Sequence, residues 1–407
     1  MTTEYRTSLK SSRPTSAPPG RLLLLSTAMG MGGGAEEQVI RLAYGFKGRG
    51  WATRIVSLLP PTQMPPDFES HGVPLSHLGM RKAIPDPRGI WRLAREVRDF
   101  RPDVVHTHMV HANLLARAVR LVQPFPLLVC THHNQTMAGV TRDWSGLFEF
   151  AHRITDRVTD YSTAISQSAT DYYVRKRAVP ASKMTFLPNG VEIARYQPDP
   201  EARARLRREL GLGDRFVWLA VGRLEAQKAY PTLLRALAAL EDRPRSLLIC
   251  GVGSLREDLE ALTTSLGLGS QVRFLGLRDD VPAVLSAADG FALSSDLEGL
   301  PLVLLQASAA ALPIVATRVG GNAEVVQHGE SGFIVPPGNP AAFAEAMARL
   351  ESLPADQRRA MGRSGQARVI DVYEEGRVVD RWERLFLDLL QRERLPRRLA
   401  RTRSMDN

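Results

Sequence analysis

The sequence predicts an α/β protein of two domains, each with a parallel sheet covered by helices on both faces. At 407 residues the chain is long enough for two domains, each of roughly 200 residues. Continuous apolar runs of strand length alternate with helical patterns, as expected for parallel strands buried on both faces. The alternation occurs twice, on either side of the turn sequence Leu187–Val191. We therefore predict two Rossmann-like halves with a cleft between them.

The first half begins with a buried strand at Arg21, and a glycine-rich turn then leads into a helix. The apolar residues of that helix, from Val39 to Phe46, recur at helical spacing. The interval 60–87 is rich in proline and glycine, so we expect a mobile substrate loop there. The other predicted strands are 53–58, 103–106, 127–130 and 161–165, and the other predicted helices are 90–100, 112–121 and 147–158.

The second half repeats this order of elements. The helical pattern 377–390 comes too late to belong to either sheet, so we expect it to cross back to the first domain. The predicted strands are 216–221, 246–250, 272–275, 290–293 and 314–316. The predicted divisions are a disordered basic tail at 1–20, domains at 21–192 and 193–375, a returning helix at 376–392 and a basic tail at 393–407.

The composition is that of a globular protein with a large core, 44% hydrophobic and 24% charged. Cys130 and Cys250 are the only cysteines, and both lie in apolar, strand-like runs. We expect two inert core thiols in a reducing compartment rather than a disulfide scaffold. Residues 1–20 are too polar for a secretory signal, and prolines interrupt the apolar run 299–317. Neither segment predicts export or a membrane span.

The net charge is +10, and arginines are concentrated between Arg392 and Arg403. Basic flanks of this kind attract an anionic membrane surface. The helix at 90–100 adds an amphipathic pattern in Ile90, Trp91, Leu93 and Val97. The alternative is a solvated tail beside an ordinary sheet-covering helix. We expect no nucleic acid partner.

The stretch Ser294–Gln306 predicts a strand end, a short acidic loop and a helix whose first turn contains Pro301. The free N–H groups and positive end of such a helix bind anions, and Glu298 lies at its mouth. A carboxylate beside an anion site suits a ligand that has both hydroxyls and phosphate. A sugar nucleotide has both.

The loop after the first strand of the second half carries two cations, Arg223 and Lys228. An arginine bonds two oxygens at once, while a lysine supplies a compact charge. The pair therefore suits a diphosphate, and ordinary surface charge is the alternative.

Of the 9 histidines, five lie between His106 and His133. His106 and His108 point to the same side of a strand, which is one feature of a metal site. No third ligand follows at metal-site spacing, so we predict no metal. We place His108 and His133 at the carboxyl ends of strands, where open α/β sheets bind ligands and a neutral imidazole can bond a hydroxyl. The alternative for each is a hydrogen-bonded core histidine.

The pattern Gly30-x-Gly32-x-x-Ala35 matches the start of a dinucleotide fingerprint. That fingerprint needs an acidic residue at the end of the second strand to hold the ribose. Here residues 56–60 contain no acid, so NAD is not expected. The glycines still let backbone approach a ligand, and we place them in the lining of the cleft.

Taken together, these segments resemble the retaining GT-B glycosyltransferases of family 4, also called glycosyltransferase group 1. The likeness spans residues 21–390 and agrees in order and spacing. The stretch His106–Arg117 further resembles members that build bacterial surface polysaccharides and lipopolysaccharides. The motifs are Gly-Gly-Gly-Ala-Glu at 32–36, Leu-Pro-Asn-Gly-Val at 187–191, Val-Gly-Arg-Leu at 221–224 with Gln-Lys at 227–228, Gly251-x-Gly253, Glu-Gly-Leu-Pro-Leu at 298–302, Val-Gly-Gly at 319–321 with Glu324, and Gly-Phe-Ile-Val-Pro-Pro-Gly at 332–338.

The resemblance implies a retaining transfer from a UDP- or GDP-sugar donor to a lipid-linked or oligosaccharide acceptor. The leaving diphosphate would deprotonate the acceptor hydroxyl, so no cofactor and no metal are implied. A cytoplasmic enzyme, peripheral on the inner face of the cytoplasmic membrane, is expected. The implied catalytic residues are His133, Glu298, Arg223 and Lys228. The implied donor contacts are Gly222, Arg223, Lys228, Gly251, Gly253, Glu298, Gly299, Leu300, Pro301, Leu302 and Gln306, and the implied acceptor contacts are Gly33, Gly34, His108 and His133.

Gln306 departs from the family pattern, which has a second glutamate at this position to bond the ribose hydroxyls. A glutamine amide accepts one hydroxyl proton but offers no charge-assisted bond. The expected loss in donor affinity is on the order of 1 to 2 kcal/mol. This departure leaves open a sugar-nucleotide-binding protein without catalytic activity. A nucleotide-sugar epimerase of the same fold is a separate alternative.

Overall fold

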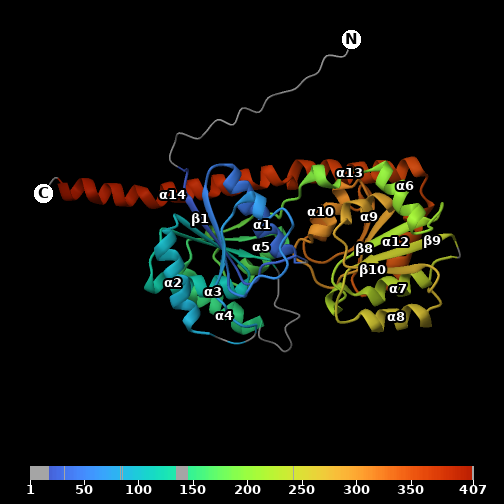
Figure 1. Cartoon of the computed structure of the whole chain (residues 1–407), viewed down its shortest axis with the longest axis horizontal. Helices are drawn as coiled ribbons and strands as arrows, with labels where there is room; N and C mark the ends of the chain where they lie inside the picture. Colours follow the sequence, from blue (N-terminus) through green and yellow to red (C-terminus); the bar gives the residue numbers. More distant parts are fainter. Residues whose placement is uncertain are drawn as a thin grey trace, which may run out of the picture.

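The structure, a computed structural model, describes residues 18–31, 33–82, 84, 86–133, 145–241 and 243–405. Within these ranges the strands form two parallel sheets, one of seven strands and one of six. The two sheets and their helices lie side by side, and the last helices run along both (Figure 1). The predicted fold class of two Rossmann-like domains is confirmed.

The first sheet has the strand order β3-β2-β1-β4-β5-β6-β7. Its strands are β1 (Arg21–Ser26), β2 (Ala52–Ser57), β3 (Leu75–His77), β4 (Val104–His108), β5 (Leu127–His132), β6 (Tyr161–Ala164) and β7 (Met184–Phe186). Its helices are α1 (Gly34–Gly48), α2 (Arg88–Phe100), α3 (Val110–Val122), α4 (Ser145–Thr155) and α5 (Gln167–Arg175), with short 3-10 turns η1 (Glu69–His71), η2 (Asp156–Val158) and η3 (Ala181–Lys183).

Strand β1 shows why this sheet is covered on both faces. Successive side chains of a strand point to opposite faces. Leu22 and Leu24 pack with residues of α1 and of the C-terminal helix, whereas Leu23 and Leu25 pack with residues of α2 and α3. All four side chains are fully buried. The uninterrupted leucine run therefore fills two separate cores.

The second sheet has the order β10-β9-β8-β11-β12-β13. Its strands are β8 (Phe216–Val221), β9 (Arg245–Cys250), β10 (Val272–Gly276), β11 (Gly290–Leu293), β12 (Ile314–Thr317) and β13 (Gly332–Val335). Its helices are η4 (Ile193–Tyr196), α6 (Pro200–Glu209), η5 (Ala226–Lys228), α7 (Tyr230–Ala238), α8 (Arg256–Ser265), α9 (Val281–Ala287), α10 (Leu302–Ala309), α11 (Asn322–Val325), α12 (Pro340–Ser352) and α13 (Ala355–Tyr373), followed by α14 (Glu375–Met405).

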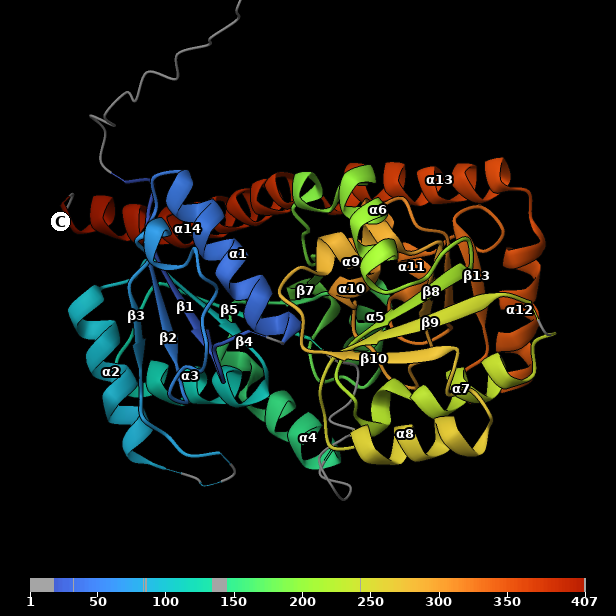
Figure 2. The same cartoon turned by 45° about the vertical axis from the view of Figure 1, so that its right-hand side comes forward.

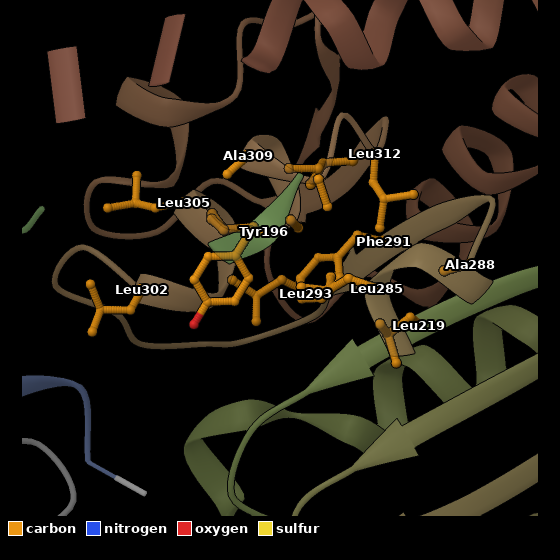
Figure 3. Close-up of a cluster of buried hydrophobic side chains, with 14 of the residues drawn as sticks. Tyr196, Leu219, Leu285, Ala288, Phe291, Leu293, Leu302, Leu305, Ala309 and Leu312 are labelled. Atoms are coloured by element: carbon orange, nitrogen blue, oxygen red, sulfur yellow. The ribbon is translucent and has the colours of Figure 1, made fainter. Parts of the chain in front are cut away.

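Helix α10 is buried nearly all round. Leu302, Leu305 and Ala309 lie in one cluster with Phe291 and Leu293 of strand β11 (Figure 3). Such a helix is held by the core around it, so its N-terminal end is fixed relative to the sheet. The structure corrects one detail of the prediction: Pro301 has an extended backbone (φ −70°, ψ 123°) and precedes the helix, which begins at Leu302.

The chain passes twice between the two sheets, and the two crossings lie together. Val191 donates its N–H to Tyr373 O at 2.9 Å, and Glu375 donates to Val191 O at 3.1 Å. Beyond this point α14 packs on α1 through Val379, Trp382 and other apolar residues, which is visible as the long helix running over the first domain (Figure 2). The predicted return to the first domain is thus seen, although the helix continues to Met405, through most of the predicted basic tail.

Several short elements were not predicted: β3, β7, β13 and α5. The interval 60–87 is also more regular than expected, because it contains η1 and β3. Cys130 and Cys250 are free and buried, as predicted. No helix among the described residues is long and apolar enough to cross a membrane. The predicted tail at 1–20 lies almost wholly outside the described residues.

Candidate functional site

Both sheets reverse their strand order next to their first strand, between β1 and β4 and between β8 and β11. Open α/β sheets bind ligands at the carboxyl ends of strands at such a switch point. In the second domain these ends carry the loop 222–228 and the loop 294–301. In the first domain they carry the glycine-rich turn and His108. The predicted site residues therefore gather at these two edges.

The loop after β8 presents the two predicted cations differently. Arg223 is exposed, whereas Lys228 is partly buried at the end of η5. Tyr230 donates its hydroxyl to Gly222 O at 3.0 Å, and Glu225 accepts from Ser254 Oγ at 2.9 Å. The loop is therefore held at Gly222 and Glu225, and no described residue forms a hydrogen bond or ion pair with the Arg223 guanidinium.

Gly251 and Gly253 pack closely against the backbone of this loop. A Cβ on Gly251 would lie 2.0 Å from Gly222 O, and one on Gly253 would lie 2.4 Å from Leu224 O. Any side chain there would displace the backbone next to Arg223. These two residues, predicted as donor contacts, thus have a packing role that explains why they are glycines.

Glu298 is bound to Lys228, its predicted partner across the site. Lys228 Nζ lies 2.6 Å from Glu298 Oε1, and Ser295 donates its hydroxyl to the same oxygen at 2.6 Å. The Glu298 residue is 8% exposed. Among the described residues Glu298 Oε2 has no hydrogen-bond partner, which leaves one carboxylate oxygen for a ligand.

The backbone after Glu298 touches the first domain. A Cβ on Gly299 would lie 1.9 Å from His133 O, so only glycine fits between the two domains here. Asn189 donates to Leu300 O at 3.0 Å and holds the next residue. No side chain among the described residues caps the N-terminus of α10, whose first N–H groups are thus available for an anion.

Gln306 lies one helical turn further along α10 and is 8% exposed. Its side-chain amide has no hydrogen-bond partner among the described residues. The position is therefore compatible with a ligand contact, but the contact itself stays a prediction.

The glycine-rich turn of the first domain faces the same loop. A Cβ on Gly34 would lie 3.7 Å from Leu302 Cδ1, in ordinary contact. The carboxylate of Glu36 folds over Gly33, where a Cβ would be 1.9 Å from Glu36 Oε2. Burial raises the pKa of Glu36, although its own backbone N–H and the charge of Arg223 oppose that rise. The charge of Arg223, in the second domain, therefore acts on Glu36 in the first.

Four buried histidines, His106, His108, His132 and His133, lie at or near the carboxyl ends of β4 and β5. His108 Nδ1 lies 2.9 Å from His133 Nε2, and His106 Nε2 lies 2.7 Å from Thr131 Oγ1. Burial lowers the pKa of His133 to about 4 and holds the pKa of His108 well below its usual range. Both imidazoles are therefore neutral near pH 7. Asn134, which follows His133, lies outside the described residues.

Sequence reasoning missed two side chains of this region. Ser295 was predicted only as part of a strand end, yet it bonds the central carboxylate. Glu324 was noted only as a motif residue, but it accepts from Gln167 N at 2.9 Å and Ser168 N at 3.0 Å, at the start of α5 in the other domain. Its spacing from the Gly320–Gly321 pair was the only available signal. Among the described residues no three His, Cys, Asp or Glu side chains form a group able to hold a metal ion.

Comparison with known proteins identifies the family. A model described as "Glycosyl transferases group 1" matches residues 202–368, and one described as "Glycosyltransferase Family 4" matches residues 32–195. A mannosyltransferase of Mycobacterium tuberculosis, named as GDP-mannose-dependent and acting on phosphatidylinositol monomannoside, is 33% identical over 268 residues, covering 62% of this chain and 67% of the relative. The chain belongs to the group 1 glycosyltransferases.

More distant relatives agree with this membership. An Escherichia coli galactosyltransferase, named for UDP-Gal and a diphosphoundecaprenol acceptor, is 26% identical over 75% of this glycosyltransferase and 81% of its own length. Anabaena HepE, solved with UDP-glucose, superimposes with a TM-score of 0.77 at 20% identity, over 91% and 100% of the two chains. WaaG, a glycosyltransferase of lipopolysaccharide biosynthesis, gives 0.72 at 18% identity, over 88% and 98%. These structural likenesses show the GT-B fold.

Proposed function

We propose that this glycosyltransferase moves a sugar, with retention of anomeric configuration, from a nucleotide-sugar donor to a lipid-linked or oligosaccharide acceptor. The observation that carries the proposal is the convergence of Lys228, Glu298 and the uncapped start of α10 at one edge of the second sheet. A cation, a carboxylate and free backbone N–H groups match the phosphates and hydroxyls of a sugar nucleotide.

The donor would lie along the second domain. Arg223 and Lys228 would bind the diphosphate. Within Gly299 to Leu302, the backbone N–H groups of Gly299, Leu300 and Leu302 would face it, since Pro301 has no N–H. Glu298 would bond a hydroxyl of the transferred sugar through its free oxygen, and Gln306 would meet the ribose. Gly222, Gly251 and Gly253 would contribute by allowing the loop to approach the ligand. A UDP- or GDP-sugar is proposed because relatives are named for GDP-mannose and UDP-Gal.

The reacting carbon would face the first domain. We place His133, Gly33 and Gly34 beside the sugar and the acceptor, since Gly299 and Leu302 touch His133 and Gly34. Glu298 is a poor candidate for a covalent nucleophile, because Lys228 and Ser295 both stabilise its charge at 2.6 Å. We infer that the departing diphosphate deprotonates the acceptor hydroxyl on the same face of the sugar. Arg223, Lys228 and the helix start would stabilise its developing charge without help from a metal ion.

The substitutions Arg223→Ala and Lys228→Ala test this function. Each should lower transfer and donor hydrolysis by about 10²- to 10³-fold, as for other lost electrostatic stabilisers. Turnover of UDP- and GDP-sugars would be measured with and without lipid-linked acceptors. Arg205→Ala is a matched control, because Arg205 is exposed on α6 away from the site. Full activity in both site variants would disprove the assignment.

The same assay distinguishes two other functions for this site. Gln306 favours a binding protein without catalysis, which would show donor binding by calorimetry and no turnover with any acceptor. An epimerase of the same fold would consume donor without an acceptor and yield an isomeric nucleotide sugar.

We also propose that the protein works in the cytoplasm, attached to an anionic membrane surface. The structure limits the amphipathic argument from α2: Leu93 and Val97 face the core, and of the four apolar residues only Trp91 is strongly exposed, at 70%. Arg88 and Arg95 flank it with side chains 74% and 77% exposed. Sedimentation with anionic liposomes, with and without residues 391–407, tests this attachment. Failure to sediment in both forms would exclude it.

A further inference from the structure

His108 and His133 form a buried pair whose geometry restricts how protons are placed. His108 is the last residue of β4, and His133 follows β5, the neighbouring strand. The two residues are 1% and 8% exposed, and His108 Nδ1 lies 2.9 Å from His133 Nε2. This is the one hydrogen bond of the His133 ring among the described residues. The orientation of that ring therefore depends on His108.

The backbone of His133 is fixed independently. Its carbonyl oxygen lies against Gly299, where a Cβ would be only 1.9 Å away. The main chain of His133 thus touches the loop that follows Glu298, at the meeting point of the two domains. With Nε2 bonded to His108, Nδ1 is the ring nitrogen left for a ligand.

A neutral pair of imidazoles shares one proton in such a bond, in either of two arrangements. If His133 Nε2–H donates, His108 must carry its own proton on Nε2. That atom is buried and has no hydrogen-bond partner among the described residues, so an N–H group would be left unpaired there. If His108 Nδ1–H donates, only a lone pair is left unpaired on His108 Nε2. Orphaned buried N–H groups are rarer than unpaired acceptors.

The other neighbours of His108 do not change this balance. The His106 ring lies close to it, tilted by 49° with ring centroids 4.1 Å apart, but its Nε2 is bonded to Thr131 Oγ1. Thr131 Oγ1 is in turn 2.8 Å from Thr163 Oγ1. His106 Nδ1 is also buried without a partner. Neither His106 nor the two threonines hydrogen-bond His108.

We propose that His108 is a positioning residue that holds His133 in its Nδ1–H tautomer, so that His133 meets the substrate as a hydrogen-bond donor. The tautomer itself does not depend on the proposed function, but its role in catalysis rests on that function. The resemblance had implied that His108 contacts the acceptor. In this proposal His108 instead positions His133. His133 then binds a hydroxyl or phosphate oxygen at the reacting centre and does not act there as a base.

The tautomer is measured directly and without turnover. A long-range ¹H–¹⁵N spectrum of the full chain labelled with ¹⁵N-histidine distinguishes protonated from bare ring nitrogens. His133→Gln identifies the signals of His133. A protonated Nδ1 and a bare Nε2 on His133 are expected. A protonated Nε2 with a bare Nδ1 would overturn the proposal, whether or not the protein transfers sugar.

Two substitutions of His108 test the role in catalysis. Asparagine can place its amide N–H near the position of Nδ1, whereas leucine cannot donate. His108→Leu should lower kcat by about 10- to 100-fold, as for other supporting residues, with donor KM little changed. The pKa of His133 should rise, because the freed Nε2 lone pair takes a proton more readily, and NMR titration of its ring nitrogens measures the rise. His108→Asn should restore part of kcat and return the pKa of His133 toward its wild-type value.

The outcomes separate this proposal from a merely structural role and from a failure of the proposed function. Equal losses in both variants with an unchanged pKa of His133 would mean that His108 only fills space, and the proposal would be wrong. If the wild-type chain turns over no nucleotide sugar, the proposed function fails, while the tautomer spectrum still decides the placement of the proton.

Discussion

The second sheet has two buried ion pairs, one where its strands begin and one where they end. At the edge where strands begin, Arg245 of β9 pairs with Glu351 of α12 at 3.0 Å, with side chains 3% and 6% exposed. At the edge where strands end, Lys228 pairs with Glu298 at 2.6 Å, with side chains 12% and 9% exposed. Burial and charge are nearly the same in the two pairs. Their positions and their hydrogen bonds differ.

Glu351 is saturated by protein groups. Trp218 Nε1 donates to one oxygen at 2.7 Å, and Arg245 Nε and Nη2 donate to the carboxylate at 3.1 and 3.0 Å. Glu298 accepts both of its bonds on Oε1, leaving Oε2 without a partner among the described residues. A carboxylate whose two oxygens both accept hydrogen bonds from protein groups indicates a structural pair. A carboxylate with one unbonded oxygen, at the carboxyl ends of the strands, indicates a ligand site.

The largest expected effects come from breaking each pair with methionine. Arg245→Met leaves the Glu351 charge buried without its cation and should lower the free energy of unfolding by about 3–5 kcal/mol. Lys228→Met should destabilise the fold less, because Glu298 keeps its hydrogen bond from Ser295. Its transfer activity should instead fall by about 10²- to 10³-fold. Urea unfolding and transfer assays on both variants measure the contrast.

A double substitution provides the control for the structural pair. Arg245→Met with Glu351→Leu replaces both charges by apolar groups and should recover most of the lost stability. If Arg245→Met instead removed activity with no loss of stability, the distinction between a saturated and an open pair would fail.

Glu375 lies where the chain crosses between the domains, and its buried charge is balanced only weakly by a nearby cation. Arg41 is 3.9 Å from it but lies 2.8 Å from Glu192. Burial first, and the nearby Glu192, Glu374 and Glu37, raise the pKa of Glu375 from 4.5 to about 7, against the effect of Arg41. Between these pH values the folded state keeps a proton that the unfolded state has lost. The stability contribution therefore falls as the pH rises through this window.

Glu375→Gln removes this dependence. Above pH 7 the wild-type penalty amounts to on the order of 3 kcal/mol, so the variant should be the more stable protein at pH 8 and no more stable at pH 4.5. Urea unfolding across this range measures the slope. Glu330→Gln, at an exposed position, is the control and should leave the slope unchanged. A slope of wild-type size in Glu375→Gln would show that another group titrates.

Much of the fold was predictable because its strands are long apolar runs. Leu22 to Leu25 and Val217 to Ala220 are buried from both sides, and such runs identify parallel strands without knowledge of their partners. The missed strands β3, β7 and β13 have three or four residues. Pairing with a neighbouring strand, rather than local pattern, makes them strands.

The site was predictable in location but not in its contacts. Alternation placed Arg223, Lys228 and Glu298 after strands, and parallel strands bring their ends to one edge. The bond between Lys228 and Glu298 spans 70 positions, and its existence depends on β8 and β11 being neighbours. Sequence alone did not establish that order. The pairing of His108 with His133 was missed for the same reason.

Substitutions of Gln306 should have the smallest effect, and they test directly whether the start of α10 belongs to the donor site. The residue is 8% exposed on α10, in the domain that holds Glu298. If it meets the donor ribose, Gln306→Glu should tighten donor binding by about 1 to 2 kcal/mol, because a carboxylate forms charge-assisted bonds with hydroxyls. Calorimetry with UDP- and GDP-sugars measures the change.

Gln306→Leu, close in volume, should weaken donor binding because it cannot accept a hydroxyl proton. The pair of variants also separates binding from folding, since a carboxylate buried in a helix core costs stability when no donor is present. Donor affinities equal to wild type in both variants would mean that position 306 does not touch the ligand. The ligand-accepting part of this edge would then end at the start of α10, and the departure from the family pattern would have no bearing on activity.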